Sequence, residues 1–129
     1  MKLILKLTPV LWLMALACQS ASEQSTLDTD ARLLAYLQCE ARQLKEQRFR
    51  VANDLRFRED SLLRLHLALT ELEKKQADSV KQVLTAQTEQ LAAKITQTMD
   101  SLFAAHYQSL ERRRELDVAT ERLVQEVCR

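Results

Sequence analysis

The side chains with the most distinctive chemistry in this sequence are three cysteines, Cys18, Cys39 and Cys128. A thiolate can bind a metal ion, act as a nucleophile, form a disulfide or accept an acyl group. No pair of cysteines has Cys-x-x-Cys spacing, and neither His66 nor His106 has a second ligand at the spacing of a metal site. We therefore expect no metal and no cofactor, which leaves disulfide formation and covalent modification as the chemistry of the thiols.

Catalytic motifs are also missing from the sequence, which contains no glycine. Phosphate-cradling loops and Gly-x-Ser-x-Gly elbows both require glycine, and the hydroxyl side chains have no recognisable His and Asp partners. The formal net charge is +1, whereas a dedicated nucleic-acid binder would carry a clear basic excess. We expect a protein that is not an enzyme, with no small-molecule substrate and no nucleic-acid partner.

The first eighteen residues, MKLILKLTPVLWLMALAC, combine two lysines with an uncharged apolar stretch over residues 7–17. That stretch is shorter than the roughly 20 residues of a membrane-spanning helix and is typical of a signal peptide. Its end, Ala15-Leu16-Ala17-Cys18, resembles the lipobox of bacterial lipoproteins, although Ala15 stands where leucine is usual. The resemblance implies a signal peptide over residues 1–17, with acylation at Cys18.

What the resemblance implies for location follows from Cys18 and its neighbour. Diacylglyceryl on the Cys18 thiol and a further chain, palmitate for example, on its amine would anchor the protein stably in a lipid bilayer. Gln19, rather than aspartate, resembles the outer-membrane class of these lipoproteins. We expect the protein to face the periplasm from the outer membrane, with the cell surface as the alternative. Ordinary signal-peptidase cleavage with secretion and an uncleaved anchor stay open. Residues 18–27 are small and polar, so we expect the lipidated cysteine to be followed by a flexible tether.

The rest of the chain, residues 28–129, predicts an all-α fold. The only proline is Pro9, and good helix formers dominate the composition. A heptad pattern over more than five repeats predicts a coiled-coil-like helix over about residues 28–76. Its two seam positions are occupied by Leu34, Ala41, Arg48, Leu55, Leu62 and Leu69, and by Leu37, Leu44, Val51, Arg58, Leu65 and Leu72.

A second apolar stripe predicts another helix over about residues 80–128. Ser79 and Gln82 have capping-box spacing, which places a turn at about residues 77–84. The two helices would then fold into a long antiparallel hairpin. Because such a hairpin buries only one stripe per helix, we expect it to be completed by dimerisation into a four-helix bundle, by a partner protein or by a disulfide. Breaks near residues 60–61 and 100–101, giving three or four shorter helices, are the alternative.

With Cys18 acylated, Cys39 and Cys128 remain as a candidate disulfide in an oxidising compartment. Two geometric arguments oppose an intramolecular bond in the hairpin. The turn of a hairpin that pairs these residues would lie near residues 83–84 and not at residues 77–79, where the sequence indicates it. Cys39 also faces away from the Leu34/Leu37 seam, whereas a bond needs Cα atoms within about 7 Å. An intramolecular bond, an intermolecular bond and free thiols therefore all stay open.

Arg48 and Arg58 interrupt the first seam, and Phe57 projects away from it on the side of Cys39. The arginine stems can pack while their guanidinium groups reach water or a carboxylate, or the two charges can fix register and partner choice. A lone exposed aromatic residue is ordinary on a protein surface. We nevertheless take Arg48, Phe57 and Arg58 as the candidate interaction surface.

The function that these features favour is that of a membrane-tethered helical scaffold or adaptor of the bacterial cell envelope, which acts through protein–protein interaction with itself or with an envelope protein. The alternative is a periplasmic chaperone or stress-sensor-like protein that binds clients. The Leu-Thr-x-x-Gln motif of that class is not matched, because Leu84-Thr85-Ala86-Gln87 places the glutamine one residue early. A lipoprotein that inhibits another protein is a third hypothesis, which no residue pattern tests.

Overall fold

The structure, a computed structural model, describes the backbone of residues 8–128 and the side chains of residues 22–128. Three helices make up this part of the chain, α1 (Thr8–Arg64), α2 (Glu71–Ala105) and α3 (Leu110–Val127), and the described residues contain no strand. The predicted all-α class is confirmed. The predicted signal peptide and the acylated Cys18 lie outside the residues whose side chains are described.

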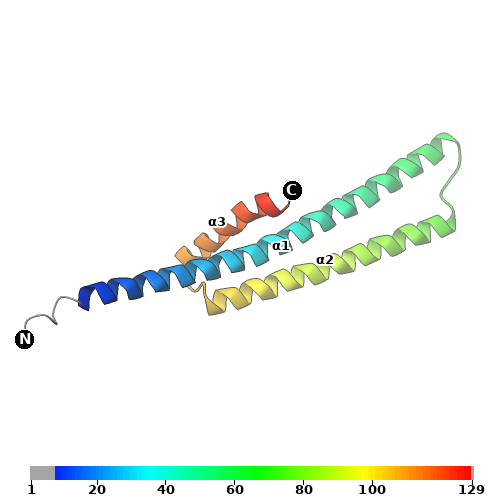
Figure 1. Ribbon diagram of the computed structural model, residues 1–129. Coiled ribbons are helices and arrows are strands. Elements are labelled where there is room, and N and C mark those ends of the chain that lie inside the picture. Colours follow the sequence, from blue (N-terminus) through cyan, green and yellow to red (C-terminus); the bar gives the residue numbers. More distant parts are fainter. Residues whose placement is uncertain (1–7, 129) are drawn as a thin grey trace, which may run out of the picture.

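Helix α1 is the axis of the molecule. Its 57 residues make a rod about 86 Å long at 1.5 Å per residue. Helix α2 turns back and lies along one side of this rod, and the shorter α3 lies against a different side, nearer the N-terminal end (Figure 1). Helix α1 therefore contacts both other helices, and its neighbours change along its length.

Helix α1 ends in a backbone cap that does without glycine. The His66 amide donates to the Leu63 carbonyl at 3.0 Å, and the Leu67 amide donates to the Leu62 carbonyl at 2.9 Å. This is the hydrogen-bond pattern of a Schellman motif, whose central residue must adopt a left-handed backbone conformation. His66 does so, with a φ of 54°. Glycine is the usual residue at such a position, but the sequence contains none, and histidine takes its place.

Helix α2 begins at a capping box that fixes where the connection ends. The Thr70 hydroxyl accepts from the Glu73 amide, and the Thr70 amide donates to the Glu73 carboxylate at 2.9 Å. The connection therefore spans residues 65–70, and the predicted turn at about residues 77–84 is wrong. Ser79 lies inside α2, because the helix already begins at the capping box of Thr70 and Glu73.

A second break divides the predicted second helix in two. Helix α2 ends at its C-cap His106, and α3 starts at the N-cap Ser109, whose side chain accepts from the Arg112 amide at 3.2 Å. The predicted single helix over about residues 80–128 is therefore corrected to the end of α2 followed by α3. The break allows α3 to lie on a face of α1 that α2 does not cover.

The segment predicted as a flexible tether, residues 18–27, is helical and belongs to α1. Two threonine hydroxyls bond back to carbonyl groups one turn earlier, Thr26 to Ser22 at 3.0 Å and Thr29 to Ser25 at 2.9 Å. Such bonds allow small polar residues to sit within a helix. Leu27 is buried in the core, so the end of this segment gains tertiary packing as well.

The main core lies where all three helices meet. We call this part the base, meaning residues 27–39 of α1, the end of α2 from residue 99, and α3. Leucine and valine side chains of α3 pack on small residues of α1, and three side chains of α2 close the cluster. Its buried members are Leu27, Ala31, Leu34, Ala35, Tyr107, Leu116, Leu123 and Val124, with Met99, Leu102 and Phe103 packed against them.

Beyond the base, only α1 and α2 lie side by side. We call this part the arm, meaning residues 42–64 of α1, the connection 65–70 and residues 71–95 of α2. The arm buries Leu69, Leu84 and Leu91, and the α1 seam residues Leu44 and Val51 are half-buried. The predicted seam thus faces α2 in the arm as far as Leu62. Two further predicted seam residues, Leu65 and Leu72, are exposed, because α1 has already ended before the first of them.

Candidate functional site

The structure brings two of the candidate site residues together across the base. Cys39 and Cys128 are at disulfide distance within one chain, with Cα atoms 5.4 Å apart. Cys39 lies on the face of α1 that α3 covers, and Cys128 caps the end of α3. The geometric arguments against this pair assumed that a two-helix hairpin carries both cysteines. They fail because the partner of Cys39 lies on a third helix.

A buried tyrosine links the start of α3 to α1. Tyr107 is 1% exposed, and its hydroxyl donates to Asp30 Oδ2 at 2.9 Å. Burial, followed by the hydrogen bond to the Asp30 carboxylate, raises the pKa of Tyr107 to about 12. The hydroxyl therefore stays protonated and donates at neutral pH. A group with so high a pKa is a poor general acid or base, so Tyr107 positions the chain.

Two arginines of α3 contact Tyr107 and its neighbour Phe103. Arg113 Nε donates to the Tyr107 carbonyl at 2.9 Å, and its guanidinium carbon lies 4.6 Å from the centre of the Phe103 ring. The Arg112 guanidinium carbon lies 5.9 Å from the centre of the Tyr107 ring. A guanidinium at these distances is attracted to the negative face of an aromatic ring. This cluster holds the break between α2 and α3 in place, which is a structural role.

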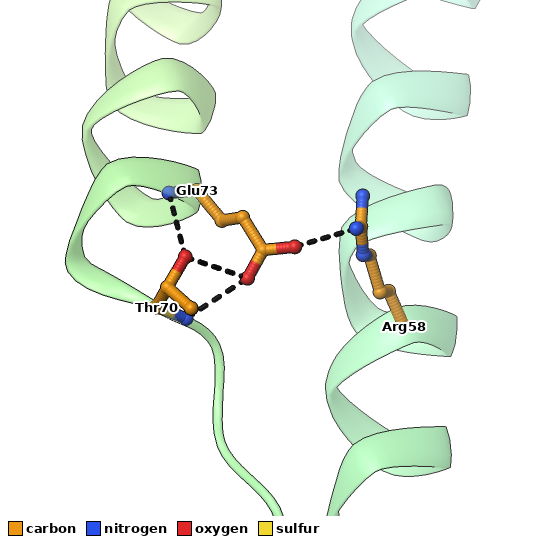
Figure 2. Close-up of polar contacts among 3 residues, drawn as sticks. All are labelled: Arg58, Thr70 and Glu73. Atoms are coloured by element: carbon orange, nitrogen blue, oxygen red, sulfur yellow. Dashed lines mark hydrogen bonds and ion pairs between the residues drawn. The ribbon is translucent and has the colours of Figure 1, made fainter.

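A second polar cluster lies at the far end of the arm (Figure 2). Arg58 Nη2 donates across from α1 to Glu73 Oε1 at 2.5 Å, while Glu73 Oε2 accepts from the Thr70 amide and hydroxyl, each at 2.9 Å. The bond from the Thr70 backbone, then that from its hydroxyl, and then the Arg58 charge lower the pKa of Glu73. Arg58 therefore fixes the start of α2 against α1.

The other two candidate surface residues behave differently from each other. Arg48 reaches across to α2, where Nη1 donates to the Thr88 hydroxyl at 3.5 Å. Phe57 is 76% exposed and lies on the opposite side of α1 from α2, as predicted from its position relative to the seam. The three candidates Arg48, Phe57 and Arg58 thus do not form one surface. The two arginines belong to the α1–α2 contact, and Phe57 faces outward.

Exposed leucines are concentrated in sequence at the end of the arm. Four leucines in and beside the connection are exposed, and together we call them the leucine tip: Leu63, Leu65, Leu67 and Leu72. Exposed leucines that are scattered singly are ordinary on a protein surface. Four within ten residues are more concentrated than that, so the leucine tip is a candidate contact surface.

Clefts in the structure lie along helix–helix contacts. The α1–α2 contact has a cleft of about 410 Å³, lined by four glutamines, two charged residues and two leucines. Among the described residues, no group of three or more His, Cys, Asp or Glu side chains is gathered to hold a metal ion. Within the same part of the chain, no helix is long and apolar enough to cross a membrane.

Sequence reasoning missed the leucine tip and the bond between Tyr107 and Asp30. One signal for the tip was available, since Leu63-Arg64-Leu65-His66-Leu67 alternates with period two and the capping box of Thr70 and Glu73 follows directly. For Tyr107 there was none, because the bond joins residues 77 positions apart.

Comparison with protein-family models, with curated proteins and with solved structures gives no match for this chain. The interpretation of its function therefore depends on the geometry described above and on the resemblance of residues 1–18 to a lipoprotein signal.

Proposed function

We propose that the protein is a lipid-anchored adaptor of the bacterial cell envelope, tethered through Cys18 and binding an envelope protein with its arm. The observation that carries this proposal is the uneven distribution of exposed large apolar side chains. Eight of the twelve among the described residues belong to the arm, namely Phe49, Phe57, Leu63, Leu65, Leu67, Leu72, Val80 and Val83. A contact surface is therefore presented by the part of the molecule with the smallest core.

The length of α1 supports the same arrangement. Cys18 and Arg64 lie on one continuous helix, 46 residues apart, which separates them by about 69 Å along the axis. An anchor at Cys18 would thus leave the leucine tip far from the acyl chains. The base would lie between the anchor and the arm and would keep the two aligned.

The arm itself is proposed as an antiparallel helical hairpin with a coiled-coil-like seam. Arg48 bonds to Thr88 and Arg58 to Glu73, so residue numbers rise along one helix as they fall along the other. Leu84 and Leu91, seven residues apart in α2, are both buried, as a heptad seam requires. A rigid hairpin of this kind can present its tip and its outer faces with little loss of conformational entropy on binding.

The anchor and the arm can be tested in the same cells. Cys18→Ala should move the protein from the membrane fraction to the soluble fraction, and mass spectrometry of the wild-type protein should find diacylglyceryl on Cys18. Release of an unmodified wild-type chain into the soluble fraction would contradict the anchor.

For the arm, a photo-crosslinking amino acid at Leu65 should give an adduct of one discrete size. The same amino acid at Leu33, an exposed leucine of the base, is the matched control and should give none. Adducts of many sizes from Leu65, together with suppressed aggregation of an unfolded client, would favour the client-binding chaperone instead.

A further inference from the structure

The face of α1 that α3 covers in the base continues along the arm, where no described helix covers it. In the base, this face presents Ala31, Ala35 and Cys39 to α3, and all three are buried. Eighteen residues make five full turns at 3.6 residues per turn. Phe49, Asn53 and Phe57 follow these positions by eighteen residues, so they lie on the same face of the rod. We call them the phenylalanine face.

Both phenylalanines of this face are exposed to solvent, Phe49 by 67% and Phe57 by 76%. Helix α3 ends beside Cys39, where its C-cap Cys128 lies 5.4 Å away between Cα atoms. Past the charged residues Arg42 and Glu46, the face that binds α3 thus continues into a part of α1 that carries two large apolar side chains and has no described neighbour. The face is therefore continuous with an established helix–helix interface.

The charges around the phenylalanine face are mainly positive. Six charged side chains share this side of α1 in the arm. They are Arg42, Glu46, Arg50, Arg56, Asp60 and Arg64. Glu46 is paired with Arg50 at 3.5 Å. Within the described part of the chain, Arg42, Arg56 and Arg64 make no ion pair, which leaves an excess of positive charge for an acidic partner to meet.

A second copy of this chain does not fit these charges. An antiparallel pairing that places Phe49 of one copy against Phe57 of the other also places Arg50 opposite Arg56 and Glu46 opposite Asp60. A parallel pairing in register places every charge opposite itself. Like charges that face each other are destabilising, so the pattern selects against self-pairing along this face.

We propose that the phenylalanine face binds an acidic amphipathic helix of an envelope protein, which lies on α1 in line with α3. The inference rests on the proposed function and specifies its partner. Helix α3 supplies the precedent, because its 18 residues bury Leu116, Leu123 and Val124 against this same face of α1. In the partner, apolar side chains at helical spacing contact Phe49 and Phe57, and carboxylates beside them reach the unpaired arginines.

The test is a photo-crosslinking amino acid placed at Phe49 or at Phe57 in the full-length protein in its own cells, with the crosslinked residues mapped by mass spectrometry. We expect adducts in a helical, acidic segment of a different protein. Ala93, an exposed residue on α2, is the matched control position and should give none. Because Phe49 and Phe57 are exposed, both substitutions should leave the fold intact, which circular dichroism checks.

A charge reversal tests the electrostatic part. Arg56→Glu with Arg64→Glu should lower the yield of the Phe49 adduct at least about tenfold, a loss that corresponds to 1.4 kcal/mol. Lys75→Glu with Lys94→Glu on α2 makes the same change in net charge and should leave the yield unchanged. Equal loss in both variants would overturn the assignment of the arginines as partner contacts.

The outcomes separate this inference from the proposed function. Adducts of Phe49 or Phe57 with lipid, with a second copy of this chain or with a basic segment would overturn the inference. So would a Leu65 adduct without any adduct at either phenylalanine, and in that case the adaptor function would stand. No adduct at any of the three arm positions would overturn both.

Discussion

Helix α1 passes through both the base and the arm, and the number of its neighbours differs between the two. In the base, two faces of α1 are covered, one by α2 and one by α3, and Ala31 and Ala35 are fully buried between helices. In the arm, only the face toward α2 is covered, and Phe49 and Phe57 are left in solvent on the other. The comparison teaches that one helix can contribute to a core where it has two neighbours and leave large apolar side chains exposed where it has one.

The largest expected effect comes from the pair Cys39 and Cys128, which lie at disulfide distance in the base. In a Cys18→Ser background, Cys39→Ser with Cys128→Ser should lower the free energy of unfolding by about 2–4 kcal/mol, because a bond across 89 residues restricts the unfolded chain. Urea unfolding followed by circular dichroism measures the loss, and reduction of the parent protein should reproduce it. Two free thiols in protein made in an oxidising compartment, or a disulfide-linked dimer, would contradict the pairing.

Truncating a buried leucine of the base and an exposed leucine of the arm tests the burial of each. Leu116→Ala removes a fully buried side chain of the base and should cost about 3 kcal/mol of unfolding free energy. Leu72→Ala removes an exposed side chain of the arm and should change it by less than about 0.5 kcal/mol. Equal losses from the two substitutions would contradict the exposure of Leu72.

Tyr107→Phe removes the hydrogen bond to Asp30 and should cost about 1 kcal/mol at neutral pH. The pKa of Tyr107 is raised from 10.0 to about 12 in the folded protein, so its contribution is fully present below pH 10 and is lost as the pH rises toward 12. Loss of stability over that range should therefore be smaller in the variant. A Tyr36→Phe background leaves one tyrosine, whose ultraviolet titration reports the pKa, and an ordinary value near 10 would contradict the burial of Tyr107.

The smallest effect is expected at the capping box of the arm. The pKa of Glu73 is lowered in the folded protein, so its contribution is present at neutral pH and is lost as the pH falls below its ordinary value of 4.5. Glu73→Gln should therefore make thermal stability less dependent on acid, and Glu89→Gln, an exposed carboxylate on the same helix, is the control. An unchanged acid profile in the Glu73 variant would mean that the cap does not hold α2.

Several features of the fold and of the candidate site could be predicted from local patterns alone. The sequence has no glycine and no proline after Pro9, and its heptads begin at Leu34, so it predicts long helices. Backbone preference and apolar spacing are properties of neighbouring residues. The outward position of Phe57 follows from the same periodicity. The place of the connection was predicted wrongly, because Thr70 with Glu73 and Ser79 with Gln82 both have cap spacing and only the fold decides which pair is used.

By itself, the sequence determined that this chain is helical, which faces of α1 are apolar, and that its first eighteen residues resemble a lipoprotein signal. Only the tertiary structure decided that α3 is a separate helix, that it covers α1 beside Ala31 and Ala35, and that it brings Cys128 to Cys39. The reason is physical. Alanines give little hydrophobic signal in a sequence, yet they allow two helices to approach closely, and this close approach depends on residues about ninety positions apart.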